Sequence, residues 1–286
     1  MLKTRLWMGT LIAAIAAGVI VFDHWLPPWY PFLFLMAVGV GTTVSREVIL
    51  LSPESSRPSQ PLILSLVCLL FAANWIQDGP AHVWQILGLA FVFITLLLFL
   101  VETARYEKPT GHSLPRTALG VFTIAYVGGT GSCLLQLRWE AGEVVTAGVY
   151  WSLPIGMIFF VPKLGDVAAY FSGRALGRTP FSPKLSPKKT WEGSVGGALG
   201  AIAVTALMVY AGHGPVTDWA KTLCLGACLA VVGQLGDLAA SMLKRDSGVK
   251  DAAKTIPGFG GMLDVVDSVL IVAPVVYFWW VFVGVT

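Results

Sequence analysis

Long apolar stretches recur along the whole chain, separated by short polar connections. Nine stretches stand out, at 6–22, 28–44, 61–77, 82–101, 117–137, 144–162, 194–212, 219–243 and 261–284. A helix of about 20 apolar residues is long enough to cross the hydrocarbon core of a bilayer. The pattern therefore predicts an all-α protein, a polytopic transmembrane helix bundle with about nine spans.

The low charge content supports a membrane protein. Charged residues make up 12% of the 286 residues and hydrophobic residues 56%, whereas a soluble domain carries about 25% charged residues. A chain with so few charges cannot cover a water-facing surface of its own. We expect residues 1–160 to form a transmembrane scaffold, where dimer contacts would lie. Residues 161–286 are expected to form a catalytic transmembrane region with cytoplasmic loops.

Basic residues are divided unevenly between the two sides of the predicted bundle. If the N-terminus lies in the cytoplasm, the loops and ends on that side hold 17 of the 19 Lys and Arg residues, all except Arg138 and Lys221. Because basic residues stay on the cytoplasmic side of a membrane, this asymmetry predicts a cytoplasmic N-terminus. Residues 1–22 also resemble a signal peptide in composition, and we take them as an uncleaved first span.

Four aspartates fall inside or at the mouth of predicted spans, namely Asp166, Asp237, Asp264 and Asp267. A carboxylate in a membrane is costly unless it is paired or binds a cation, so such a residue is a candidate for function. All four lie in the C-terminal half of the chain. We therefore expect any chemistry to reside there.

The segment 234–245 places polar residues on one helix face. Gln234, Asp237, Ser241, Lys244 and Arg245 fall within an arc of roughly 100°. A carboxylate, a hydroxyl and two cations in that order suit a metal ion and a phosphate chain at the membrane surface. The alternative is an ordinary polar face packed inside a bundle, with the two cations as cytoplasmic anchors.

The segment 257–268 leads into the last span and carries two carboxylates. Asp264 and Asp267 are three residues apart and share a helix face with Ser268. Two unpaired carboxylates this close would repel each other, and Mg²⁺, which favours carboxylates together with phosphate oxygens, would remove the conflict. The alternative is that the pair forms salt bridges with Lys250 or Lys254.

The loop between these segments holds mixed charges. Lys250 and Lys254, with Lys244 and Arg245, are candidates to clamp a triphosphate, and Asp251 is a candidate metal contact. The alternative is a solvated loop, which is the usual state of a charge-rich loop.

A third candidate site covers residues 165–197. Asp166 and Tyr170 share a helix face, and Lys188, Lys189 and Thr190 offer cations and a hydroxyl to phosphates. Neither a phosphate-loop motif nor a dinucleotide-binding glycine motif occurs in the sequence. Nucleotide binding would therefore depend on metal, basic loops and helix ends.

These segments together resemble the signature of the phosphatidate cytidylyltransferases. The run from Ser241 to Ser268 reads Ser-Met-Leu-Lys-Arg-x4-Lys-Asp-x5-Pro-Gly-x-Gly-Gly-x2-Asp-x2-Asp-Ser. The upstream Gly-Asp-x2-Ala-Tyr and Ser-Pro-Lys-Lys-Thr-Trp-Glu-Gly segments are also similar to that family. Two positions differ from its usual pattern, since Phe259 stands where His is usual and Val265 where Arg is usual. Neither difference removes a carboxylate.

The resemblance implies an integral membrane enzyme that joins CTP to phosphatidic acid, giving CDP-diacylglycerol and pyrophosphate. It implies Mg²⁺ in a two-metal site, and a monovalent cation such as K⁺ stays open. The candidate metal ligands are Asp264, Asp267, Asp237 and Asp166. The candidate catalytic residues are Asp237, Ser241, Lys244, Arg245, Lys250, Asp251, Asp264 and Asp267, and the candidate substrate-binding residues are Lys188, Lys189, Thr190, Tyr170, Ser268 and Lys254.

We further expect a homodimer in the cytoplasmic (inner) membrane of a bacterium, with its active site facing the cytoplasm and with no nucleic-acid partner. Two other classes stay open. One is a related membrane enzyme that uses CTP, such as a CDP-archaeol synthase or a polyprenol kinase, and product analysis separates these. The other is an ion-coupled transporter, in which buried carboxylates serve ion binding.

Overall fold

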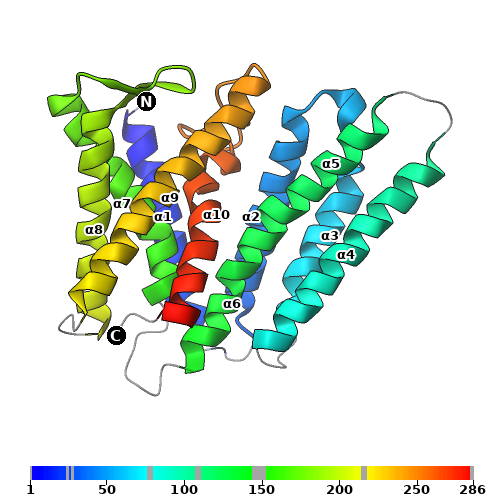
Figure 1. Cartoon of the computed structure of the whole chain (residues 1–286), viewed down its shortest axis with the longest axis horizontal. Coiled ribbons are helices and arrows are strands. Elements are labelled where there is room, and N and C mark those ends of the chain that lie inside the picture. The colour runs from blue at the N-terminus through cyan, green and yellow to red at the C-terminus, as the bar shows by residue number, and fades with distance from the viewer. Residues whose placement is uncertain are drawn as a thin grey trace. The chain divides into compact units, whose positions relative to one another are not determined.

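The computed structural model describes residues 2–23, 26, 29–75, 80–106, 111–143, 153–213 and 218–283, and helices make up most of them (Figure 1). The predicted all-α fold is confirmed. The helices are α1 (Leu2–Asp23), α2 (Pro31–Leu51), α3 (Gln60–Ala73), α4 (Pro80–Ala104), α5 (Ser113–Thr123), α6 (Thr130–Glu143), α7 (Leu153–Leu176), α8 (Trp191–His213), α9 (Trp219–Asp246) and α10 (Met262–Phe278). A 3-10 turn spans Glu54–Ser56, and π-helical turns span Ile124–Gly129 and Trp279–Val283.

Seven helical segments in the described ranges are long and apolar enough to cross a membrane. They are Pro31–Leu51, Val83–Ala104, Ser113–Arg138, Leu153–Leu176, Trp191–Gly212, Trp219–Asp246 and Met262–Val283. Two shorter apolar helices, Trp7–Asp23 and Gln60–Ala73, account for the other two predicted stretches. The number of spans and the side of the membrane that holds the N-terminus stay predictions.

The chain divides into two compact units. The first contains Met1–Gln136 and Asp251–Leu263, and the second contains Leu137–Lys250 and Asp264–Thr286. This structural division does not test the predicted division of function at residue 160, which stays a prediction.

Buried polar side chains in the first unit are paired with one another. The Asn74 amide donates to Ser132 Oγ at 3.1 Å, and the Gln136 amide donates to Asn74 Oδ1 at 2.9 Å. Such hydrogen bonds satisfy polar groups that have no water to bond to in a membrane interior. Asn74, at the end of α3, therefore joins that helix to α6.

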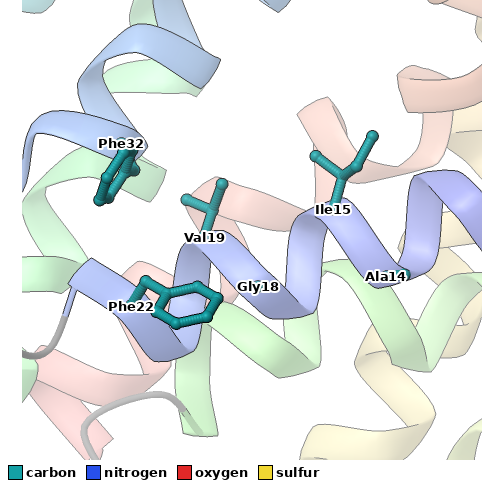
Figure 2. Close-up of a pocket in the computed structure, with 6 residues that line it drawn as sticks. All are labelled: Ala14, Ile15, Gly18, Val19, Phe22 and Phe32. Carbon is teal, nitrogen blue, oxygen red and sulfur yellow. The ribbon is translucent and has the colours of Figure 1, made fainter.

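The first unit also has a shallow apolar hollow of about 380 Å³. Its lining side chains are Ala14, Ile15, Gly18, Val19 and Phe22 on α1 and Phe32 on α2 (Figure 2). The lining is almost entirely apolar, which is typical of a surface in contact with hydrocarbon.

Small residues bring α7 and α8 into close contact in the second unit. A Cβ added to Gly197 would lie 2.8 Å from Ala169 Cβ and 3.1 Å from the Gly165 carbonyl oxygen. A Cβ added to Gly200 would lie 2.5 Å from Ala168 Cβ. These glycines of α8 therefore serve as helix contacts, the arrangement that small residues favour in membranes.

The structure moves the boundary of one predicted span. The apolar stretch 144–162 was expected to end before Lys163, but α7 runs from Leu153 to Leu176 and includes Lys163 and Asp166. Residues 144–152 lie outside the described part. The helix continues past the predicted apolar stretch, and Lys163 and Asp166 form an ion pair within it.

A β-hairpin connects α7 to α8, which the sequence analysis did not predict. Strands β1 (Pro180–Ser182) and β2 (Ser186–Thr190) are antiparallel, with Pro180 opposite Thr190 and Ser182 opposite Ser186. The hairpin lies at the end of α8 where that helix begins (Figure 1). It thereby places the Ser-Pro-Lys-Lys-Thr segment at the beginning of α8.

The close approach of α7 and α8 leads to a stability prediction. Gly197→Leu should lower the free energy of unfolding by about 1–3 kcal/mol, because an added side chain meets rigid backbone and Cβ atoms. Gly88→Leu on α4 is the matched control, since nothing lies within 4 Å of a Cβ added there. Thermal unfolding in detergent measures both, and equal melting temperatures for the two variants would contradict the contact.

Candidate active site

Three carboxylates of the second unit are each paired with a lysine from another element. Asp237 on α9 forms an ion pair with Lys189 on β2. Asp264 and Asp267, both on α10, are paired differently: Asp264 contacts Lys244 on α9, and Asp267 Oδ1 lies 3.1 Å from Lys163 Nζ on α7. Lys250 and Lys254, which the sequence offers as alternative partners of this pair, form no ion pair with any residue that the structure describes.

Lys163 is the functional candidate that the sequence analysis missed. Its Nζ lies 3.1 Å from Asp267 and 3.9 Å from Asp166, and it also interacts electrostatically with Asp237. The sequence offered one signal, because Lys163 and Asp166 stand three residues apart, a spacing that brings side chains together on a helix. The apolar pattern places Lys163 just beyond the stretch 144–162, so that pattern alone does not indicate the pair.

Asp237 and Asp267 interact electrostatically with each other and with Lys163. They come from α9 and α10, which approach closely because Gly236 has no side chain. A Cβ at Gly236 would lie 3.0 Å from the Asp267 carbonyl oxygen. Two carboxylates in such proximity repel each other unless cations lie between or beside them. Lys163 and Lys189 supply that positive charge.

The hairpin brings Lys189 to Asp237, and its last residue fixes the beginning of α8. Thr190 Oγ1 accepts a hydrogen bond of 3.1 Å from the Gly193 amide, which is N-capping. Glu192 accepts hydrogen bonds from the backbone amides of Arg178 and Thr179 at 3.1 and 3.2 Å. Thr190 therefore has a structural role beside its predicted contact with substrate.

The remaining predicted residues of the second unit fall into two groups. Arg245 ties the hairpin to the loop after α9, since it donates to the carbonyl oxygens of Leu185 and Val249. Lys188 and Lys250 are exposed to solvent. Tyr170, 59% exposed, forms a hydrogen bond of 3.1 Å with Arg174.

The predicted hydroxyl residues Ser241 and Ser268 are both buried. The Ser268 backbone amide donates to Asp267 Oδ1 at 2.6 Å, whereas its Oγ atom has no hydrogen-bond partner among the described residues. Gln234, one helical turn before Asp237, exchanges hydrogen bonds with Ser194 on α8. These contacts fix one face of α9 against α8.

The donor atoms fit a hard cation that binds together with phosphate. Across the described residues, no group of three or more His, Cys, Asp or Glu side chains is arranged to hold a metal ion by itself. Mg²⁺, however, is usually bound by one or two carboxylates with substrate phosphates and water. Asp237 and Asp267 meet that requirement. Asp264, which is committed to Lys244, lies outside this pair, and the predicted two-metal site stays a prediction.

The segment 256–263 belongs to the first unit and forms the start of α10. Phe259 N donates to the Ile256 carbonyl at 3.1 Å, and Gly258 has a φ of +86°. With Pro257 before it, this geometry fits a type II turn, which requires Gly at its third position. Phe259, the residue that differs from the family pattern, lies against α1, 3.4 Å from a Cβ placed on Gly9.

Glu47 on α2 is the second residue that the sequence analysis missed. Its carboxylate accepts hydrogen bonds from the amides of Met262 and Leu263. No sequence signal pointed to it, because its partners lie 215 and 216 residues away. Asp251 and Lys254, also of the first unit, are exposed.

Comparison with known proteins supports a single family. The family model described as "Cytidylyltransferase family" matches residues 3–283. The chain is 45% identical to the phosphatidate cytidylyltransferase of Synechocystis, over 96% of this chain and 94% of the relative. It is 36% identical to the phosphatidate cytidylyltransferase of Haemophilus influenzae, over 99% and 100% of the two chains. The protein of that name from Brucella suis is 33% identical over 68% and 72%.

The buried Lys244–Asp264 pair leads to a second stability prediction. Lys244→Met should cost about 3–5 kcal/mol, because it leaves a buried carboxylate without its cation. The double variant Lys244→Met with Asp264→Asn should recover much of that loss. Lys221→Met is the control, because its pair with Asp218 spans 3.8 Å and is about one-third exposed. Unfolding in detergent measures all variants, and equal losses for Lys244→Met and the double variant would contradict the coupling.

Proposed function

The chain belongs to the cytidylyltransferase family, and on that premise we propose that it transfers the cytidylyl group of CTP to phosphatidic acid. The products are CDP-diacylglycerol and pyrophosphate. The observation that carries the proposal is a set of carboxylates on membrane helices, each paired with a lysine. The two most important are Asp237 and Asp267. The signature segments that contain them lie within the matched residues 3–283.

The reaction requires positioning and charge neutralisation more than a strong base. An oxygen of the phosphatidic acid phosphate attacks the α-phosphorus of CTP and forms the new phosphorus–oxygen bond. The bond between the α-phosphorus and the bridging oxygen breaks, and its electron pair leaves with pyrophosphate. Because the nucleophile is already an anion, catalysis depends on holding several negative groups together.

Lysine side chains around the carboxylates suit this task. Lys189 and Lys163 hold Asp237 and Asp267, and both are partly exposed, with 29% and 37% of their side-chain surface accessible. A nucleotide phosphate offers each ammonium a second anionic partner. Lys188 on the same strand adds a further cation that carries no structural contact among the described residues. We therefore assign phosphate binding to the hairpin and to Lys163.

Asp237 and Asp267 are the residues of this chain that would hold Mg²⁺. A cation bound there supplies charge neutralisation for the attacking and leaving oxygens. Asp166 lies beside Lys163 and is our candidate for a further ligand. Asp264 is assigned to fixing Lys244 in the interior, because both side chains are less than 10% exposed.

The active site is proposed to face the cytoplasm of a bacterial cell, from the inner membrane. Support comes from the basic residues, which gather in the hairpin and in the loop after α9, as cytoplasmic segments do. The lipid substrate would then reach the site sideways and keep its acyl chains in hydrocarbon. The homodimer stays a prediction.

The names of the relatives favour cytidylyl transfer over the related activities considered above. A polyprenol kinase would release CDP, whereas cytidylyl transfer releases pyrophosphate. An ether-lipid acceptor would give the same leaving group with a different lipid product. Purified protein incubated with labelled CTP, phosphatidic acid and Mg²⁺ distinguishes these outcomes by chromatography. Release of CDP, or no consumption of CTP, would contradict the proposal.

Removal of either central carboxylate should abolish turnover. Asp237→Asn and Asp267→Asn are each expected to lower kcat by about 100-fold or more, because both remove charge where the reaction needs it. Asp246→Asn, an exposed residue at the end of α9, should keep wild-type activity. Normal turnover in both central variants would overturn the assignment of these carboxylates.

The proposed orientation has its own test. A single cysteine placed at Lys184, an exposed residue between the hairpin strands, should react with a membrane-impermeant maleimide in inverted inner-membrane vesicles. It should stay unlabelled in intact spheroplasts. The four native cysteines are first replaced by alanine or serine. Labelling in spheroplasts only would place the hairpin on the opposite side.

A further inference from the structure

The first turn of α10 begins without a capping side chain of its own. A helix leaves its first backbone N–H groups without intrahelical partners, and the residue before the helix usually satisfies one of them through its side chain. In α10 that residue is Gly261, which has no side chain. The amides of Met262 and Leu263 therefore need an acceptor from elsewhere in the protein.

Glu47 on α2 supplies that acceptor. Its Oε1 atom accepts from the Met262 amide at 2.9 Å, and its Oε2 atom accepts from the Leu263 amide at 2.7 Å. Thr255 Oγ1 donates a third hydrogen bond of 3.0 Å to Oε1. Glu47 is 3% exposed and forms no ion pair with a Lys or Arg in the described ranges. Its charge is therefore stabilised by the positive end of the helix.

Gly261 makes room for this contact. A Cβ on Gly261 would lie 2.6 Å from Glu47 Oε2 and 2.9 Å from the Ala253 amide nitrogen. A side chain at residue 261 and the carboxylate of Glu47 cannot occupy the same space. Gly261 thus has no side chain to cap α10, and the space that this leaves is occupied by the capping carboxylate of Glu47.

We propose that Glu47 is a positioning residue for cytidylyl transfer, which rests on the function proposed above. It fixes the residue at which α10 begins and the direction in which its first turn points. Leu263 is the last residue whose amide donates to Glu47. Asp264 is the next residue, and Asp267 lies four residues after Leu263. Because each residue turns a helix by about 100°, a shift in the start of α10 would redirect both carboxylates.

A carboxylate can accept hydrogen bonds from both amides at the start of α10, and a side-chain amide cannot. The two oxygens of Glu47 accept from two amides at once, whereas a glutamine side chain has one oxygen and turns its NH₂ group toward the second N–H. Glu47→Gln therefore keeps the size of the side chain but leaves one backbone donor unsatisfied. The variant changes the start of α10 without touching either aspartate.

The test compares Glu47→Gln with Glu54→Gln, the same substitution at an exposed residue of the same unit. Glu47→Gln is expected to lower kcat by about tenfold, because a lost buried hydrogen bond at the helix start misplaces the reacting groups. The KM for CTP should change by less than about threefold, since the lysines that bind the triphosphate lie on other elements. The affinity for Mn²⁺, followed by electron paramagnetic resonance without substrate, should weaken about fivefold. Glu54→Gln should match the wild type throughout.

A second variant covers the case in which Glu47→Gln does not fold. Thr255→Val removes one of the three hydrogen bonds and keeps the carboxylate, so it should show the same changes to a smaller extent. Wild-type kcat and Mn²⁺ affinity in a folded Glu47→Gln protein would overturn the inference. A loss of activity that only follows the folded fraction, with unchanged Mn²⁺ affinity, would show a structural role alone and would also overturn it. Failure of the proposed function itself would appear differently, as no CTP turnover in the wild type or in Glu54→Gln.

Discussion

The energetic cost of placing carboxylates in membrane helices is the constraint on which the rest of this structure depends. Such a group is tolerated where a cation meets it, and the structure provides one for each aspartate of the candidate site. Lys163 meets Asp267, and Lys189 meets Asp237. These pairs do more than neutralise charge, because each joins two different elements. The same contacts that permit burial thus bring together the carboxylates and lysines of the candidate site.

Close helix packing by small residues makes those contacts geometrically available. α7 and α8 approach through Gly165 and Gly197, and α9 approaches α10 at Gly236. Larger side chains would hold the helices apart, because a packed interior cannot absorb the added volume without strain. The hairpin then brings Lys189 to the end of α9 that carries Asp237. Glycine positions and charged positions are therefore parts of one arrangement, and neither would be sufficient by itself.

The first turn of α10 shows how a residue far away in the sequence can satisfy the start of a helix. The turn at Pro257 and Gly258 precedes Gly261, the residue before α10. Glu47 then accepts hydrogen bonds from the first two amides of that helix. The scaffold expected of the N-terminal half therefore includes a specific polar contact in addition to apolar support.

The sequence by itself determined the helical membrane fold and the family, and it singled out the carboxylates of the candidate site, because apolar length and fixed motif spacing are local properties of a chain. It did not determine the partners of those carboxylates. The loop lysines Lys250 and Lys254 were the alternative partners of Asp264 and Asp267, yet these two carboxylates are paired with lysines on two different helices. The apolar pattern leaves Lys163 and Glu47 outside every predicted span and gives neither a role. Both depend on contacts between segments about 100 to 200 residues apart, as the separations of their partners show, and only tertiary packing decides which segments meet.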